Sequence, residues 1–214
     1  MNLNISLCMD NASSSGILRG KPFGGICFLW RKFIAKCIKV VNCYPNGRCV
    51  ALSLRVANEI ILIVSVYITN FNCSATYKVE LGECIGFIEN TINSNIYHDL
   101  IIVSDTHFPC SLSNPWFKQF NQFLTDFKLV HCDNFISNPD INTYVHDALG
   151  NFSCIDHFFV TNALLLNLKK ISITDSGVNH SDHKPICGFF DISLDLNIAK
   201  SGKTSLRAGY NSYS

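Results

Sequence analysis

The chain contains the stretch Leu100-Ile101-Ile102-Val103-Ser104-Asp105-Thr106-His107, in which a run of apolar residues ends at polar ones. A continuous apolar run of this length is typical of a strand that is covered on both faces. A second run, residues 60–67, ends in the same way at Tyr67 and is followed by Thr69 and Asn70. The two runs therefore predict two buried strands of one sheet, each with polar side chains at its end.

Short β-rich segments recur along the rest of the chain. The stretch Tyr44-Pro45-Asn46-Gly47 separates two of them, as the turn of a hairpin would. The strands that we predict span residues 25–30, 36–41, 49–56, 60–67, 100–104, 154–161, 170–174 and 186–191.

Two helices are also expected. Residues 75–95 place apolar side chains near a period of 3.6 residues. The second helix opens at Asn114-Pro115, a capping residue followed by proline in the first turn. Its apolar set is mostly aromatic, and the spacing indicates a helix that faces the core rather than a platform for stacking bases. Strand hairpins with inserted helices predict a layered α/β sandwich.

The composition fits a globular domain. The 214 residues are 48% hydrophobic and 15% charged, against a usual charged fraction of about 25%. We expect one domain over residues 1–195 and a polar tail or linker over residues 196–214. A net charge of +1 shows no strong electrostatic footprint for nucleic acid or membrane, although a neutral total can hide a local basic patch.

The N-terminus and the cysteines indicate an intracellular protein. No basic segment followed by an apolar one marks a signal peptide, and the longest apolar stretch is about half of a membrane span. We therefore expect a nuclear or cytoplasmic protein that is neither secreted nor bound to a membrane.

The eleven cysteines include no Cys-x-x-Cys pair, which disfavours a zinc ribbon, and we expect reduced cysteines packed in the core.

Two further motifs place acidic residues and histidines beside predicted strands. They are Ser153-Cys154-Ile155-Asp156-His157-Phe158 and Asn179-His180-Ser181-Asp182-His183-Lys184-Pro185-Ile186. Strand ends in a rigid sheet can aim such side chains into a shared cleft. Several converging carboxylates would repel one another unless a divalent cation such as Mg²⁺ or Mn²⁺ were bound.

Each motif is weak when taken alone. A Ser-Asp-His triplet usually belongs to an ordinary loop, and Asp105 alone would suit a turn or a helix cap. Single histidines such as His131 and His157 are usually surface or satisfied core residues. It is the order and spacing of the whole set that indicates a site.

That ordered set resembles the endonuclease/exonuclease/phosphatase superfamily, and most closely the endonuclease domains of non-LTR retrotransposons. The resemblance covers residues 15–191. Its further mark is the hairpin start Gly20-Lys21-Pro22-Phe23-Gly24-Gly25. It implies a four-layer α/β sandwich, in which two packed mixed sheets are flanked by helices. It also implies a DNA endonuclease that uses Mg²⁺ or Mn²⁺, with a reverse transcriptase encoded downstream.

The resemblance also implies roles for the first residues of the set. Tyr67 and Asn70 would contact the scissile phosphate. Asp105 would orient or deprotonate the attacking water, or protonate the leaving group, and His107 stands at a catalytic position beside it. The reaction would be an in-line hydrolysis of a phosphodiester that leaves a 3′-hydroxyl.

The other three residues would form the second half of the site. The resemblance implies that Asp156 holds the imidazole of His183, and that His183 acts as a base or stabilises the developing charge. Asp182 would contribute to the metal site.

Two departures from the family pattern predict weak or absent nuclease activity. Family members read Gly-Asp-Phe-Asn where this chain has Ser104-Asp105-Thr106-His107, so a histidine replaces a phosphate-binding asparagine. Family members also begin with a strand bearing an asparagine, a helix, and a strand ending in a metal-binding glutamate. The match begins after that point, and neither Asn2, Asn4 and Asp10 nor Glu59, Glu80 and Glu83 lie in the matching context.

Two alternatives follow from these departures. One is a catalytically inactive module that binds nucleic acid or protein with the same fold. The other is a phosphatase of the superfamily, which the short loops and the Gly-Gly hairpin disfavour.

Overall fold

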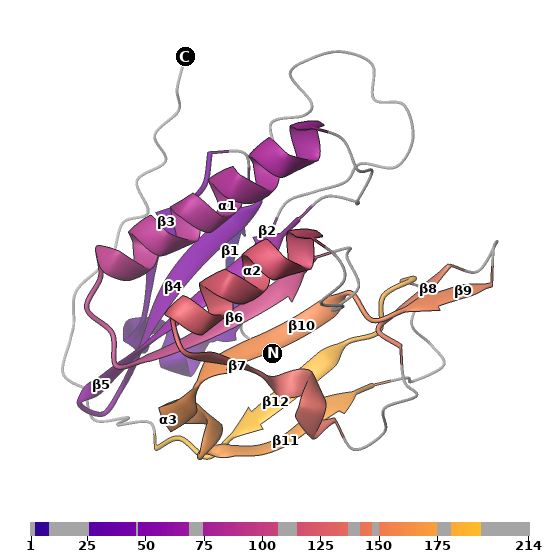
Figure 1. Ribbon diagram of the computed structural model, residues 1–214. Helices are drawn as coiled ribbons and strands as arrows, with labels where there is room; N and C mark the ends of the chain where they lie inside the picture. The colour runs from indigo at the N-terminus through magenta and orange to yellow at the C-terminus, as the bar shows by residue number, and fades with distance from the viewer. Residues whose placement is uncertain are drawn as a thin grey trace, which may run out of the picture.

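A six-stranded mixed sheet organises the molecule, with the strand order β3-β4-β5-β6-β10-β7 (Figure 1). The structure, a computed structural model, describes residues 3–8, 26–45, 47–68, 75–106, 115–136, 142–146, 150–174 and 181–193. The strands are β1 (Leu3–Cys8), β2 (Ile26–Arg31), β3 (Ile38–Cys43), β4 (Cys49–Val56), β5 (Glu59–Tyr67), β6 (Asp99–Asp105), β7 (Leu129–His131), β8 (Tyr144–His146), β9 (Asn151–Ser153), β10 (Asp156–Thr161), β11 (Leu168–Ile173) and β12 (Ile186–Phe190). The helices are η2 (Lys32–Cys37), α1 (Ala75–Asn93), α2 (Pro115–Asp126), η3 (Cys132–Phe135) and α3 (Asn162–Leu165).

The centre of the sheet is the parallel pair β5 and β6, which α1 connects. Every other pair of neighbours in this sheet is antiparallel. The two apolar runs that predicted buried strands form this pair. Because β10 runs antiparallel to β6, the start of β10 lies beside the end of β6, and the polar strand ends meet at one edge.

The face that α1 and α2 cover, here called the helix face, carries the larger core. Figure 1 shows the two helices side by side over the sheet. Side chains such as Ile88 of α1 and Phe120 of α2 are fully buried against Leu100, Ile102 and Phe159. The prediction that the second helix faces the core is confirmed, and α1 packs on the same face of the sheet.

The opposite face, here called the ladder face, packs on the two-stranded pair β11–β12. Ile61, Ile101 and Val160 of the sheet form a core with Ile171 of β11 and Leu164 of α3. A second two-stranded pair, β1–β2, lies on the same side of the molecule, as the cavity described below shows. The predicted mixed α/β fold is confirmed. Beside the six-stranded sheet, the described residues contain three separate two-stranded sheets, β1–β2, β11–β12 and β8–β9.

Successive side chains of β10 alternate between the two faces, as they must in a strand. Phe159 belongs to the core of the helix face, whereas Phe158 and Val160 pack in the core of the ladder face. Asp156 therefore points to the ladder face and His157 to the helix face.

Four strands were not among those predicted. β7, β8 and β9 have three residues each, which is too short for a periodic pattern. β1 does show an alternation, with Leu3, Ile5 and Leu7 separated by polar residues, and it pairs antiparallel with β2 so that Cys8 lies opposite Ile26. Residues 36–37, predicted as the start of a strand, end η2 instead.

The cysteines follow the expectation only in part. Seven of those in the described residues are free, of which Cys37, Cys49, Cys84 and Cys132 are buried, Cys154 and Cys187 are partly buried, and Cys27 is exposed. Cys43 is disulfide-bonded, so the expectation of reduced cysteines is wrong for this residue.

Across the described ranges, the helices are all too short or too polar to span a membrane. The predicted tail, residues 196–214, and the predicted site residues Asn70 and His107 lie outside the described residues.

Candidate active site

Three of the predicted site residues lie side by side at one edge of the sheet. Asp105, the last residue of β6, is the Cα partner of Tyr67 in β5 and of Asp156 in β10. Main-chain hydrogen bonds continue past the strand ends, because the Ile68 N–H donates to the Asp105 carbonyl at 2.8 Å and the Thr106 N–H to the Ile155 carbonyl at 2.9 Å. The backbone therefore fixes the spacing of the three residues.

His183 lies between two of these carboxylates. Its Nδ1 is 3.0 Å from Oδ2 and 3.2 Å from Oδ1 of Asp156. Its Nε2 is 4.0 Å from Oδ2 of Asp105. The predicted pairing of Asp156 with the imidazole of His183 matches this geometry, which leaves Nε2 directed towards Asp105.

The carboxylates favour the protonated form of this imidazole. The hydrogen bond with Asp156 raises the pKa of His183, burial opposes that effect, and the negative charges of Asp156, Asp105 and Asp182 add to it. The net direction is upward. Half-burial strengthens these charge effects relative to water.

Main-chain contacts with the strand β8 hold the segment that carries His183. The Val145 N–H donates to the Asp182 carbonyl at 2.9 Å, and the Lys184 N–H donates to the Thr143 carbonyl at 2.7 Å. The ring of Tyr144 packs edge-on against the ring of His183, with centroids 5.0 Å apart. Main-chain hydrogen bonds of its two neighbours, Asp182 and Lys184, therefore hold His183 in place, and the contact with Tyr144 restricts its ring.

Thr143 connects the two halves of the site. Besides its carbonyl bond to Lys184, its hydroxyl oxygen accepts hydrogen bonds from the N–H groups of Ile155 at 3.0 Å and Asp156 at 3.2 Å. The residue is completely buried. Thr143 was not predicted as a site residue, and no motif around it in the sequence would have indicated its position.

A cavity of about 270 Å³ opens beside these groups. Tyr67, Asp105 and Asp156 line it together with Cys27 of β2 and Ile186 of β12. The cavity therefore lies on the ladder face, between the β1–β2 and β11–β12 ladders. Its volume is below the roughly 300–1,000 Å³ of sites that enclose a whole small molecule, which suits one phosphate group of a larger substrate.

The same groups form a potential cation site. The ligand atoms of Asp105, Asp156 and His183 all lie within 4.8 Å of one another. Two carboxylates match the oxygen ligands that Mg²⁺ and Mn²⁺ prefer. Asp182 is exposed and is not part of this group, so its role as a metal ligand stays a prediction.

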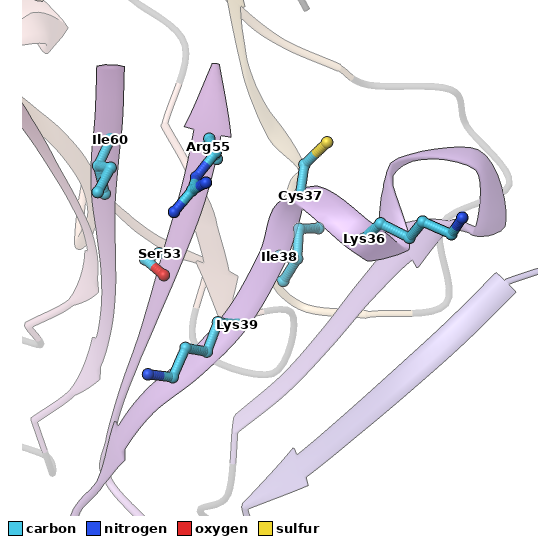
Figure 2. A pocket seen from close by; sticks show the side chains of 7 residues that line it. All are labelled: Lys36, Cys37, Ile38, Lys39, Ser53, Arg55 and Ile60. Carbon is cyan, nitrogen blue, oxygen red and sulfur yellow. The ribbon is translucent and has the colours of Figure 1, made fainter. Parts of the chain in front are cut away.

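A second cavity, of about 290 Å³, lies away from this site. Figure 2 shows Lys39 and Arg55 coming from the neighbouring strands β3 and β4, and Lys36 from η2. Ile60, at the start of β5, also lines it. Since Tyr67 lies seven residues further along the strand, this basic cavity is about 23 Å from the carboxylate edge.

Solved structures share this fold. The endonuclease domain of TRAS1, a telomere-specific non-LTR retrotransposon, has 17% identity, with 87% of this chain and 80% of that chain covered at a TM-score of 0.59. The Neisseria 3′ phosphatase NExo bound to a product DNA hairpin has 15% identity, coverage of 88% and 79%, and a TM-score of 0.64. The catalytic domain of Xenopus laevis APE2 has 14% identity, coverage of 89% and 76%, and a TM-score of 0.65.

No protein-family model and no curated protein matches the chain. At these identities the likeness concerns the fold, which is that of the endonuclease/exonuclease/phosphatase proteins.

Proposed function

We propose that this chain is a divalent-metal-dependent DNA phosphodiesterase domain of retrotransposon origin, with weak activity. The observation that carries the proposal is the Asp156–His183 pair, which faces Asp105 beside a cavity lined by Tyr67. The fold supports the reaction class, since the similar structures include an endonuclease domain and a 3′ phosphatase. The similarity to the TRAS1 domain supports the origin. We also propose that the domain ends near residue 195.

In this proposal the imidazole stabilises charge. Asp156 accepts the Nδ1–H of His183 and so sets the orientation of the ring. The raised pKa of His183 favours a protonated Nε2, which donates to an oxygen of the phosphate as negative charge develops.

Asp105 and Tyr67 act on the other reacting groups. Asp105 takes the proton of the attacking water as its oxygen bonds to phosphorus. The bond from phosphorus to the 3′ oxygen breaks, the leaving oxygen takes a proton from a solvent water, and the products are a 3′-hydroxyl and a 5′-phosphate. Tyr67 donates from its phenol to the phosphate that the cavity holds. Asn70 and His107 would complete the phosphate contacts.

Asp105 and Asp156, with Asp182 from the segment before β12, are the residues that would hold Mg²⁺ or Mn²⁺. Such an ion supplies positive charge for the phosphate oxygens when it is bound.

The weak activity follows from a departure inside the sequence. His107 stands where the family resemblance implies a phosphate-binding asparagine. Because an imidazole is bulkier than an amide side chain, it would hold the phosphate less well than the asparagine.

Nicking of supercoiled plasmid DNA in the presence of Mg²⁺ tests the proposal. We expect slow nicking by the wild type that falls to background in His183→Ala and in Asp156→Asn. Lys39→Ala is the matched control, because Lys39 lies at the other end of the sheet, and it should nick at the wild-type rate. Nicking that survives His183→Ala would exclude this site, and wild-type turnover at an ordinary nuclease rate would exclude the proposed weakness.

The histidine at position 107, where the resemblance implies a phosphate-binding asparagine, favours a second candidate, a module that binds DNA without cutting it. A fluorescent duplex distinguishes the two, since this candidate requires binding with no nicking and no effect of His183→Ala on affinity. Parallel assays separate endonuclease from phosphatase activity. They compare the rates of hydrolysis of an abasic oligonucleotide, a 3′-phosphorylated oligonucleotide and a phosphoinositide.

A further inference from the structure

A second cluster of ionisable side chains lies on the helix face, behind the candidate active site. His131 Nε2 is 2.9 Å from Asp133 Oδ2, and His157 Nδ1 is 2.6 Å from the same oxygen. The two imidazole nitrogens are 3.2 Å apart. Three metal-ligating atoms from residues that are up to 26 positions apart in the sequence thus converge on one point.

Rigid elements hold the cluster. His131 ends β7, His157 is the second residue of β10, and Asp133 lies in η3. The ring of His131 stacks on Phe159, with centroids 4.8 Å apart and an interplanar angle of 20°. His157 is 1% exposed, and the Asp133 side chain is 14% exposed. The ligand atoms are therefore preorganised rather than carried on exposed loops.

The spacing of the three atoms accommodates a metal ion. They form a triangle with sides of 2.6, 2.9 and 3.2 Å. The circle through its corners has a radius of about 1.7 Å, which is shorter than Zn–N and Zn–O bonds of about 2.0–2.2 Å. A point at bonding distance from all three atoms therefore exists outside their plane, and a small outward movement of the side chains would open the angles at the ion towards tetrahedral values.

The charge balance of the cluster also favours a cation. His131 and His157 both contact one oxygen of the largely buried Asp133 carboxylate, Oδ2. Its other oxygen, Oδ1, is buried and has no hydrogen-bond partner among the described residues. A buried carboxylate with an unsatisfied oxygen is costly unless a positive charge compensates it.

We propose that His131, Asp133 and His157 form a binding site for a transition-metal ion, with Zn²⁺ as the best match. Imidazole nitrogens suit Zn²⁺ and disfavour Mg²⁺ and Ca²⁺, which take oxygen ligands. Three protein ligands leave one position for water. The proposal does not rest on the proposed function, because these side chains lie on the opposite face of β10 from Asp156.

Cys154 is a neighbour of this site rather than a ligand. Its Sγ is 3.7 Å from Asp133 Oδ2. The ligand atoms that lie within 4.8 Å of one another here are those of His131, Asp133 and His157, and Cys154 is not among them. Two neutral imidazoles and one carboxylate remain, a set that binds a divalent cation without excess negative charge.

Zinc binding by the purified full chain tests the proposal. After exhaustive chelation and dialysis, competition with a chromogenic zinc chelator gives the affinity and the number of ions bound. We expect one tightly bound Zn²⁺ per chain and a higher thermal unfolding midpoint with Zn²⁺ than with Mg²⁺. His131→Gln and Asp133→Asn should each weaken the binding by roughly a hundredfold or more, since even outer-shell partners contribute 10–100-fold.

Matched variants locate the ion. His98→Gln removes a histidine outside the cluster, whose Nδ1 accepts only a main-chain hydrogen bond from Ile60 at 3.0 Å, and should bind Zn²⁺ like the wild type. Asp156→Asn alters the candidate active site and should also leave the tight binding unchanged. Circular dichroism confirms that Asp133→Asn, which keeps the side-chain shape, is folded. Binding that survives Asp133→Asn, or that is lost in Asp156→Asn, would overturn the proposal, as would a wild type that binds no Zn²⁺.

Discussion

At the scale of single residues, the candidate site depends on one imidazole and its supports. The carboxylate of Asp156 orients the ring of His183, and Thr143 joins the segments that carry both residues. The sequence predicted the first pairing because Asp156 and His183 both belong to motifs with a known order. Thr143 acts mainly through its position in the fold, so no sequence pattern pointed to it.

The pKa of His183 provides a first prediction. In the metal-free protein, Asp156→Asn should lower it, because the raised value comes first from the hydrogen bond with Asp156. The C2 proton of His183 in a pH series of NMR spectra measures the change, with Lys39→Ala as the control.

The same shift makes the stability depend on pH. A raised folded pKa contributes stability that is fully present below the unfolded value of about 6.5 and is lost as the pH rises through the folded pKa. The difference in unfolding free energy between the wild type and Asp156→Asn should therefore be larger at pH 6 than at pH 9. An equal difference at both pH values would contradict this cause.

Thr143 provides a second prediction. Thr143→Val keeps the shape but removes the acceptor for two N–H groups, one of them buried and the other partly buried, at a cost of about 1–3 kcal/mol. Chemical denaturation measures this loss. Thr143→Ser keeps the hydroxyl and should recover most of it. If Thr143→Ser were as unstable as Thr143→Val, packing of the methyl group rather than hydrogen bonding would explain the role of the residue.

At the scale of elements, the strands that the sequence predicted best are those with the longest apolar runs. The prediction for residues 49–56 has the same bounds as β4, and β5 differs from its prediction by one residue. Such runs are informative because both faces of the central strands are covered. The three-residue strands β7, β8 and β9 leave no comparable signal, yet β7 and β8 support the two clusters of functional side chains.

The helix α2 provides a third prediction. Phe120 is fully buried and lies 5.4 Å from the ring of Phe159 and 5.7 Å from that of Phe123. Phe120→Ala should lower the unfolding free energy by about 3–5 kcal/mol. Phe152, which is 63% exposed, is the matched control, and Phe152→Ala should change the stability by less than about 0.5 kcal/mol. Similar losses in both variants, measured in urea, would show that α2 does not carry the core.

At the scale of the whole molecule, ordered motifs predicted the location of the candidate site, whereas the metal cluster of the helix face was not anticipated. His131 and His157 were each interpreted as ordinary histidines, because no motif with metal-ligand spacing contains them. Only the pairing of β7 with β10 and the turn into η3 bring them to Asp133. Register between strands is a property of the assembled fold, and a single sequence does not show it.

The alternation of side chains along β10 affects how inhibition experiments are interpreted. Asp156 and His157 are adjacent in sequence, but they belong to two potential metal centres on opposite faces. A chelator such as EDTA would remove ions from both, so inhibition by EDTA alone would not identify a catalytic metal. Two chelated samples would distinguish the centres, one that receives only Mg²⁺ and one that receives only Zn²⁺. The ion that restores the nuclease activity assigns the metal requirement to one face of the strand.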